Sequence, residues 1–244
     1  MNIDIEQIYK DFIRKKATSG GRRPGLHVSD LVSDCIRKPW YRMSGLEQEI
    51  DDATIPNFYY GTVIHESFEG MFKTMEFHMT VNPFEELIDT EIVDIRKEMK
   101  SNPYKWVSGS LDAIVGDNEG ILDFKTMAKL KQPFDSYVKQ LNFYSYMYYL
   151  YTGIFIDKGY ILGISKEYLM EFEEKQFLTH GSKKLGGDVK VFEFDLNEPE
   201  FNQMMMCDIM DEIAKDEPPE RNESYFCNWC PYMKTCEPKN IYNS

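Results

Sequence analysis

The chain has 244 residues, of which 42% are hydrophobic and 14% aromatic, and its formal net charge is −13. This composition predicts a globular protein with a sizeable core, as one domain with an appendage or as two small domains. The acidity argues against general coating of nucleic acid, although it is compatible with a local basic groove. No window approaches the roughly eighteen apolar residues of a membrane helix, and the first residues lack a signal-peptide pattern. We therefore expect a cytoplasmic protein with reduced or metal-bound thiols.

The amino-terminal region predicts an amphipathic helix over residues 3–16, because its large apolar residues recur on one side. The basic stretch at residues 13–25 includes Arg22 and Arg23 beside a glycine pair. It is interpreted as a solvated helix end and loop, with a phosphate-contacting arm as the alternative.

Two further helices and one strand are expected before the middle of the chain. Ser29 would cap a helix that is interrupted at Pro39. Helical spacing returns over residues 58–77, and a strand is plausible over residues 87–95.

The stretch SLDAIVGDNEGILDFKT, residues 110–126, predicts an antiparallel hairpin with its turn at residues 117–118. In that register Asp112 lies opposite Asp123, and the side chains of Asp123 and Lys125 share a face. Two facing carboxylates are destabilising unless a cation lies between them, so the hairpin indicates a metal site. The alternative is a surface ion pair of Asp123 and Lys125, with Asp112 merely ending a strand.

The carboxyl-terminal half predicts a long aromatic helix over residues 136–153, closed by Gly153. Strands are expected over residues 159–165 and 189–195, followed by a helix over residues 198–219 that Pro218 and Pro219 stop. The order of elements predicts a mixed α/β fold with a central mixed sheet flanked by helices.

Three of the five cysteines lie close together in CNWCPYMKTC, as Cys227, Cys230 and Cys236. Cys35 is preferred over Cys207 as a fourth ligand, because Cys207 falls in an apolar helical stripe where a buried thiol is ordinary. Four cysteines suit either zinc or an iron–sulfur cluster, and spacing alone does not choose between them. With Cys35, the site would join the first quarter of the chain to its last residues as a structural staple.

With these features in view, the chain resembles the PD-(D/E)XK nuclease superfamily, and specifically the RecB-like nucleases that carry an iron–sulfur cluster. Among these it is most similar to the small CRISPR-associated exonucleases and their phage and viral relatives. The motifs run in the family's order from about residue 29 to 236: CIRKPWY with Cys35 and Arg37, GTVIHE with Gly61 and His65, GSLDAI with Gly109 and Asp112, ILDFKT with Asp123 and Lys125, QLNFY with Gln140 and Tyr144, and CNWCPYMKTC.

The resemblance implies a restriction-endonuclease-like core and a cysteine-ligated iron–sulfur subdomain built from the two terminal segments. It also implies that a divalent ion is held by four groups: His65, Asp112, Asp123 and the backbone carbonyl of Phe124. Oxygen-rich ligation suits Mn²⁺ or Mg²⁺, and the imidazole favours Mn²⁺ modestly. The family often has glutamate where this chain has Asp123, whose shorter side chain requires a small shift of the strand.

The resemblance further implies that Lys125 orients or deprotonates the attacking water and stabilises the developing charge. The electrostatic role is preferred, because a lysine that acts as a base needs a depressed pKa. Gln140 and Tyr144 share a helical face and would reach the phosphate or position Lys125. Taken alone, His65 reads as a core histidine and Tyr144 as a packing residue. Arg37, like Arg22 and Arg23, is a candidate DNA contact, with a helix cap as its alternative role.

The leading hypothesis is a Mn²⁺- or Mg²⁺-dependent DNA exonuclease with a 4Fe-4S cluster, acting on single strands or DNA ends, with endonuclease activity left open. One alternative is a non-catalytic DNA-end-binding or adaptor subunit with the same fold, and another is a zinc-stapled RNA-processing or structural protein. The expected regions are an N-terminal helical region (1–57), a nuclease core (58–196) and a C-terminal helix and cysteine segment (197–244). DNA is the expected partner, no membrane is expected, and oligomerisation is neither predicted nor excluded.

Overall fold

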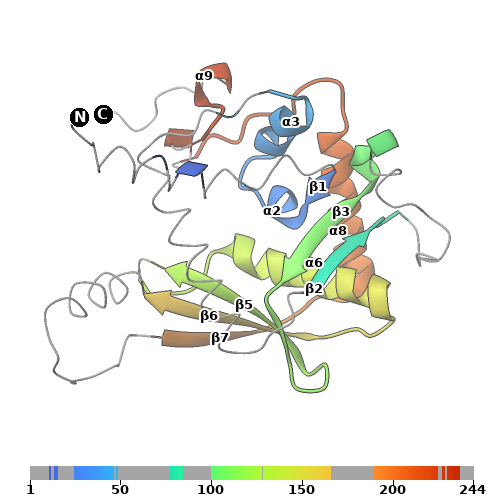
Figure 1. Cartoon of the computed structure of the whole chain (residues 1–244), viewed down its shortest axis with the longest axis vertical. Coiled ribbons are helices and arrows are strands. Elements are labelled where there is room, and N and C mark those ends of the chain that lie inside the picture. The colour runs from blue at the N-terminus through green and yellow to red at the C-terminus, as the bar shows by residue number, and fades with distance from the viewer. Residues whose placement is uncertain are drawn as a thin grey trace, which may run out of the picture.

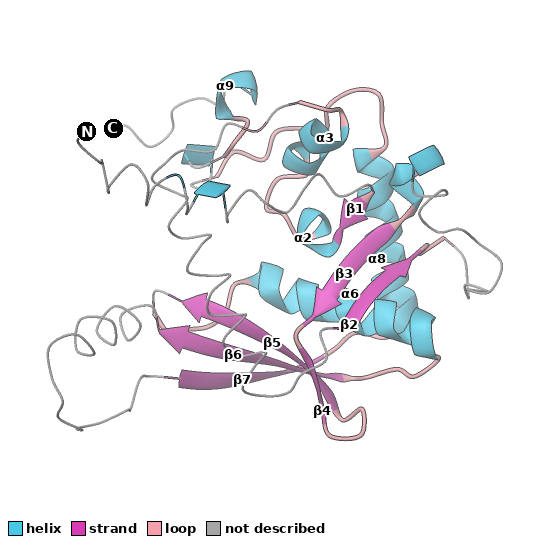
Figure 2. Ribbon diagram, viewed as in Figure 1, coloured by secondary structure: helices cyan, strands magenta, loops and turns pink. Residues whose placement is uncertain are grey.

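The computed structural model describes residues 11, 14–15, 25–46, 48, 77–84, 100–127, 129–165, 189–224, 227–228 and 230–236. These residues form a three-stranded sheet in the order β1-β3-β2 and a four-stranded sheet in the order β4-β5-β6-β7, with helices packed against them (Figures 1 and 2). The mixed α/β class is as predicted, but the strands are divided between two sheets. Within this part of the chain, every helix is too short or too polar to cross a bilayer.

Several predicted elements lie outside the described residues. They are most of the predicted helix at 3–16, all of the predicted strand at 87–95, and residues 58–76 of the predicted helix at 58–77. That last residue, Phe77, begins strand β2 (Phe77–Val81) instead of ending a helix.

The three-stranded sheet is built around β3 (Val107–Leu111), which alternates buried and half-buried residues. β1 (Leu26–His27) pairs with it in parallel, and β2 pairs with it antiparallel on its other edge. A 3₁₀ turn, η1 (Pro103–Lys105), leads into β3. β1 and β2 were not predicted, because two and five residues carry too little periodicity to be recognised alone.

The chain passes from one sheet to the other at Asp112. Leu111 pairs with Phe77 in the three-stranded sheet, whereas Ala113, which begins β4 (Ala113–Val115), pairs with Leu122 in the four-stranded sheet. Asp112 is the bend between these two ladders. A bend with a strand on each side holds this carboxylate at the junction of the two sheets.

The predicted hairpin is confirmed. β4 pairs antiparallel with β5 (Gly120–Met127), and the turn between them spans residues 116–119. Gly116 and Asn118 adopt φ values of 58° and 67°, in the left-handed region that glycine and asparagine tolerate best. The turn is therefore centred where the sequence placed it.

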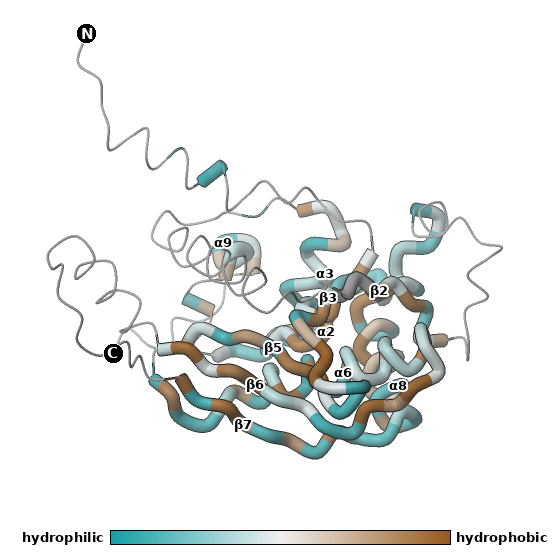
Figure 3. Tube along the Cα trace, turned by 60° about the horizontal axis from the view of Figure 1, so that its bottom comes forward, coloured by the Kyte–Doolittle hydropathy of each residue, from teal (hydrophilic) through white to brown (hydrophobic). Residues whose placement is uncertain are grey.

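The two strands predicted after the aromatic helix are also confirmed. β6 (Lys158–Ser165) pairs in parallel with β5, and β7 (Val189–Asp195) pairs antiparallel with β6. β7 contains both hydrophobic and hydrophilic residues (Figure 3), and they alternate on either side of the adjacent pair Val191 and Phe192. A parallel pair needs a crossover, and the helix between β5 and β6 supplies it.

That crossover helix is α6 (Asp135–Thr152), closed by Gly153 with φ 73° as the sequence predicted. α6 contacts strands of both sheets and packs against α8 (Pro199–Ile213). Its buried residues and those of the strands form one core, which includes Leu26, Val81, Val107, Leu111, Ile121, Leu141, Phe143, Met147, Ile161 and Met206.

α8 ends earlier than predicted, at Ile213 instead of at Pro218. Pro218 disfavours the helical conformation of the residue before it, so a helix that this proline stops ends before it. The indole nitrogen of Trp40 donates to the carbonyl of Lys215 at 2.8 Å, so the chain beyond the helix is held by another element.

The predicted helix after Ser29 is two helices, α2 (Val28–Leu31) and α3 (Arg37–Met43). The predicted interruption at Pro39 is wrong, since the break spans residues 32–36 and Pro39 lies in the first turn of α3. A proline is tolerated there because the first backbone N–H groups of a helix have no intrahelical acceptor.

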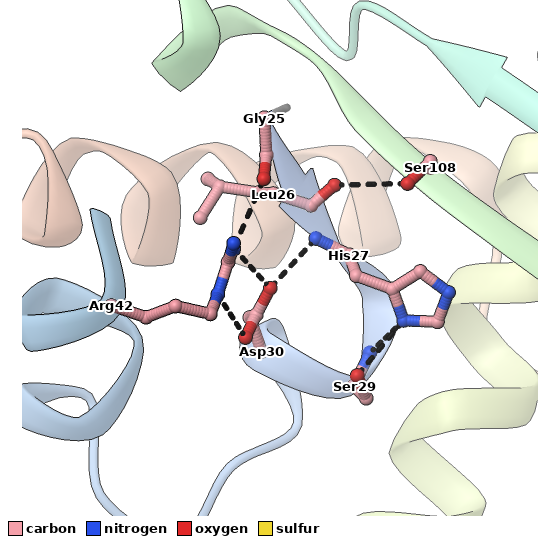
Figure 4. Close-up of polar contacts among 7 residues, drawn as sticks. All are labelled: Gly25, Leu26, His27, Ser29, Asp30, Arg42 and Ser108. Carbon is pink, nitrogen blue, oxygen red and sulfur yellow. Dashed lines mark hydrogen bonds and ion pairs between the residues drawn. The ribbon is translucent and has the colours of Figure 1, made fainter. Parts of the chain in front are cut away.

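The cap of α2 is His27 and not Ser29, as Figure 4 shows. The Ser29 N–H donates to His27 Nδ1, and the His27 N–H donates to Asp30 Oδ2 at 2.8 Å. Arg42 of α3 donates to both carboxylate oxygens of Asp30, at 2.6 and 3.1 Å, and to the Gly25 carbonyl at 3.0 Å. One carboxylate thus caps α2 and also fixes α3 beside it.

Candidate active site and cysteine cavity

Asp112, Asp123 and Lys125 lie together beside the junction of the two sheets. The backbone N–H of Phe124 donates to Asp112 Oδ2 at 2.7 Å, which brings this carboxylate against the residue next to Asp123. Lys125 Nζ is 2.7 Å from Asp123 Oδ2. The side chains of Asp123 and Lys125 are only 3% and 16% exposed, so the alternative of a surface pair is wrong.

Lys125 is held in its charged form. Burial lowers the pKa of Lys125. The Asp123 carboxylate raises it through its charge and a hydrogen bond, and the Asp112 carboxylate raises it through its charge. The two carboxylates outweigh burial, so the net shift of the pKa is upward. An ammonium group at this place can stabilise negative charge on a bound phosphate, and it is a poor base while it keeps both carboxylate neighbours.

The two carboxylates fit a hard divalent cation, which prefers oxygen ligands. Asp123 is 2% exposed as a whole residue, and burial of a carboxylate is tolerable only beside positive charge. The other predicted ligands are His65, which lies outside the described residues, and the carbonyl of Phe124, in β5 between Asp123 and Lys125. Among the residues that the structure describes, no three His, Cys, Asp or Glu side chains converge closely enough to hold one metal ion.

Tyr137 of α6 is a neighbour of this site that the sequence interpretation missed. Lys125 Nζ lies 5.2 Å from the centre of the Tyr137 ring, in a cation–π contact. Burial raises the pKa of Tyr137, Lys125 opposes that rise, and Asp123 and Asp34 add to it. The sequence signal was the spacing of Tyr137, Gln140 and Tyr144, which recur on one face of the helix.

Gln140 and Tyr144 share a face of α6, as their spacing predicted, and Gln140 Nε2 donates to the Tyr144 hydroxyl oxygen at 2.8 Å. Tyr144 is 2% exposed and packs against Gly109 of β3, where an added Cβ would lie 2.9 Å from Tyr144 Cε1. The absence of a side chain at Gly109 therefore lets α6 approach β3 beside the acidic pair. That Gln140 and Tyr144 contact the phosphate stays a prediction.

Four of the five cysteines line one cavity of about 230 Å³. Cys35 precedes α3, and Cys227, Cys230 and Cys236 come from the segment that ends in α9 (Met233–Cys236). Figure 1 shows α3 and α9 at the same side of the molecule, above the sheets. Cys207 lies elsewhere, on α8, where its Sγ is 3.6 Å from the Pro83 carbonyl oxygen.

The cavity presents hydrogen-bond donors to the sulfur atoms. Arg37 Nη1 is 3.8 Å from Cys236 Sγ, and the Ser224 N–H donates to Cys227 Sγ at 3.4 Å. Burial raises the pKa of the Cys230 thiol, whereas the backbone of Tyr232 and the charge of Lys38 lower it. The net shift of the Cys230 pKa is upward, so burial outweighs the neighbouring donor and charge and favours the neutral thiol.

Arg37 also joins the cavity to the end of the chain, because its Nε donates to the Pro219 carbonyl at 2.8 Å. Asn222 Nδ2 donates to the carbonyl of Asp34 at 2.6 Å. The walls of the cavity are therefore tied together directly. A DNA contact of Arg37 stays a prediction, and Arg22 and Arg23 lie outside the described residues.

Comparisons with known proteins agree with this geometry. A solved structure described as "Crystal structure of SSO0001" is similar with a TM-score of 0.58 and 15% identity, over 96% of this chain and 96% of that chain. At that identity the likeness shows the fold alone. A search of curated proteins finds no match. The family model for the PD-(D/E)XK nuclease superfamily matches residues 28–237, which include the acidic pair, the lysine and all five cysteines. The chain belongs to the PD-(D/E)XK nuclease superfamily, which implies a metal-dependent nuclease.

Proposed function

We propose that the protein is a metal-dependent DNA exonuclease that acts on single strands or DNA ends. The observation that carries the proposal is the group formed by buried Asp123 and half-buried Asp112 and Lys125 at the bend between two sheets, in a chain of a nuclease superfamily. Two neighbouring acids, one of them buried, are costly to assemble beside a single ammonium, and a bound divalent cation would offset that cost.

His65, Asp112, Asp123 and the Phe124 carbonyl would hold Mn²⁺ or Mg²⁺, and the two carboxylates described here have the oxygen chemistry that these ions prefer. Such an ion, when bound, polarises a phosphoryl oxygen and eases deprotonation of a water.

The protein's own groups position the phosphate and stabilise its charge. The Lys125 ammonium faces the place where a phosphodiester becomes more negative, and preorganised charge of this kind contributes strongly to phosphoryl transfer. Its pKa is raised, which supports an electrostatic role over a role as the base. Asp123 and the Tyr137 ring hold the ammonium from two sides. The lysine therefore needs little reorganisation when substrate binds.

We infer that Cys35, Cys227, Cys230 and Cys236 hold a 4Fe-4S cluster, with zinc as the alternative. The observation that supports a bound group is that these four cysteines, far apart along the chain, line one cavity of about 230 Å³. The proposed likeness to RecB-like iron–sulfur nucleases depends on these cysteines.

The test is cleavage of end-labelled single-stranded and double-stranded DNA with Mn²⁺ or Mg²⁺. Asp112→Asn and a chelator should each abolish cleavage. Asp117→Asn is the matched control, because Asp117 is an exposed residue in the turn of the same hairpin and should leave the rate unchanged. Products that shorten from one labelled end would support exonuclease action. Binding without cleavage in every metal would instead support an adaptor subunit.

The cluster has its own measurement. Anaerobically purified protein should be brown, with about four iron atoms per chain, as the proposed cluster requires. Colourless protein that contains only zinc would overturn the cluster and leave the nuclease proposal standing.

A further inference from the structure

Phe134 is an apolar ring that faces solvent next to the candidate active site. It is 58% exposed, although it follows directly on the buried Pro133 and begins the long helix α6. Leu130, earlier in the same connection, packs against the core. In the segment between β5 and α6, Leu130 and Pro133 therefore face the core, whereas Phe134 faces solvent.

The exposed ring packs against a neighbouring ring. Its centre lies 5.5 Å from that of Tyr137, with an interplanar angle of 75°, which is a favourable edge-to-face contact. Tyr137 in turn lies 5.2 Å from Lys125 Nζ. The Phe134 ring is therefore joined to Lys125 through the Tyr137 ring by two short contacts. A few nucleotides of a strand can cover the distance between Phe134 and Lys125.

The chain segment that contains Phe134 is basic, although the chain as a whole is acidic. Residues 129–139 contain Lys129, Lys131 and Lys139 and a single acid, Asp135, whereas the whole chain has a net charge of −13. Lys129 and Lys131 are exposed. This local excess of positive charge complements a phosphate backbone, and aromatic rings beside basic groups are how single strands are commonly bound.

We propose that Phe134, supported by Tyr137, is a base-stacking platform that seats an unpaired nucleotide of single-stranded DNA close to Lys125, with Lys129 and Lys131 contacting the adjacent phosphates. This platform deepens the proposed nuclease function and rests on it. Inside a duplex both faces of each base are covered by neighbouring base pairs, so the platform favours single strands and DNA ends over the interior of a duplex.

The test uses the full chain carrying Asp112→Asn, so that DNA is bound without being cut, and a short single-stranded oligonucleotide with one 2-aminopurine. Phe134→Ala should weaken binding about tenfold and abolish quenching of the 2-aminopurine at the seated position. Phe134→Trp should keep the affinity. Tyr151→Ala is the matched control, because Tyr151 is a 51% exposed ring on the same helix, about 25 Å along its axis, and should change neither readout.

A second arm separates stacking from a general structural effect. An abasic site at the quenched position should weaken binding to the Phe134 protein about as much as Phe134→Ala does, and should cost the Phe134→Ala protein almost nothing further. If the abasic site and Phe134→Ala each weaken binding and their factors multiply when combined, the platform is overturned. Unchanged affinity and quenching in Phe134→Ala would also overturn it. If the protein without these substitutions cleaves DNA while the platform fails, the nuclease function stands. If that protein neither binds nor cleaves DNA, both proposals fall.

Discussion

Lys125 and Asp123 form an ion pair that is almost wholly removed from solvent. The net stability of such a pair is small, because desolvation offsets the attraction of the two charges. Removing one partner lowers the free energy of unfolding strongly, because the remaining charge then stays buried without compensation. In the proposed site, a divalent ion and the ammonium would share the negative charge of Asp123.

Lys125→Met should therefore lower the free energy of unfolding by about 3 kcal/mol in chelator, measured by urea denaturation. Asp123→Asn added to Lys125→Met should recover part of that loss. As the pH rises, the loss caused by Lys125→Met should stay constant from neutral pH to about 9.5. The raised pKa of Lys125 means that its stabilisation is complete below its unfolded value of about 10.4 and disappears only above it.

The same titration discriminates between the two roles of the lysine. If the difference between Lys125→Met and the unsubstituted protein shrinks already near pH 8, the pKa is depressed and Lys125 is suited to be the base. A difference that persists to high pH supports the electrostatic role. Asp117→Asn, in the exposed turn, should show no pH-dependent difference over this range.

At the scale of elements, the contact between α6 and β3 depends on a residue without a side chain. A Cβ at Gly109 would meet Tyr144 Cε1 and Val28 Cγ2, each at 2.9 Å, so α6, β3 and α2 all meet at this point. Tyr144 is buried and Val28 is fully buried, so neither side chain can turn away from the new Cβ without disturbing the core. Packing here sets how α6, which carries Tyr137, lies relative to the acidic pair.

Gly109→Ala should cost about 1–3 kcal/mol in urea denaturation, the usual range for overpacking in a core. Val28→Ala will also destabilise alone, but the double variant should lose less than the sum of the two single losses, because it opens space beside the new Cβ. Strict additivity would show that α2 does not restrict this position.

At the scale of the whole molecule, the four-cysteine cavity joins the break before α3 to the segment that ends in α9. The direct hydrogen bonds from Arg37 to Pro219 and from Asn222 to Asp34 tie the same two regions. The short helix α9 has only four residues, too few to be stable alone. A bound group at the cysteines would supply the stability that this region lacks.

Cys35→Ser and Cys236→Ser should each reduce the iron or zinc content and lower the thermal midpoint, whereas Cys207→Ser, outside the cavity, should leave the metal content unchanged. Hydrogen exchange should quicken in residues 32–43 and 219–236 and remain slow in β5, β6 and the middle of α6, because only the tied regions lose their link. Uniformly faster exchange across the chain would contradict a local staple.

How much was predictable differs among the elements. The hairpin, α6 and the strands β6 and β7 were predicted because their signals are local: turn formers between apolar runs, a glycine that closes a helix, and alternation. The end of α8, the cap of α2 and the role of Pro39 were predicted wrongly, since each depends on which residue supplies a partner or where a turn begins. β1 and β2 were missed because they exist only by pairing with β3.

For the site, the sequence by itself determined the residue types and their order: two acids and a lysine in one hairpin, three cysteines in ten residues, and a fourth far away. These follow from strand alternation and from motif spacing, which are properties of the local chain. Only the tertiary structure decided that the chain changes sheets at Asp112, that Tyr137 lies against Lys125, and that Cys35 lines one cavity with the three distant cysteines. Each of these depends on contacts between residues far apart along the chain, which arise when separate elements bury their apolar faces in a shared core.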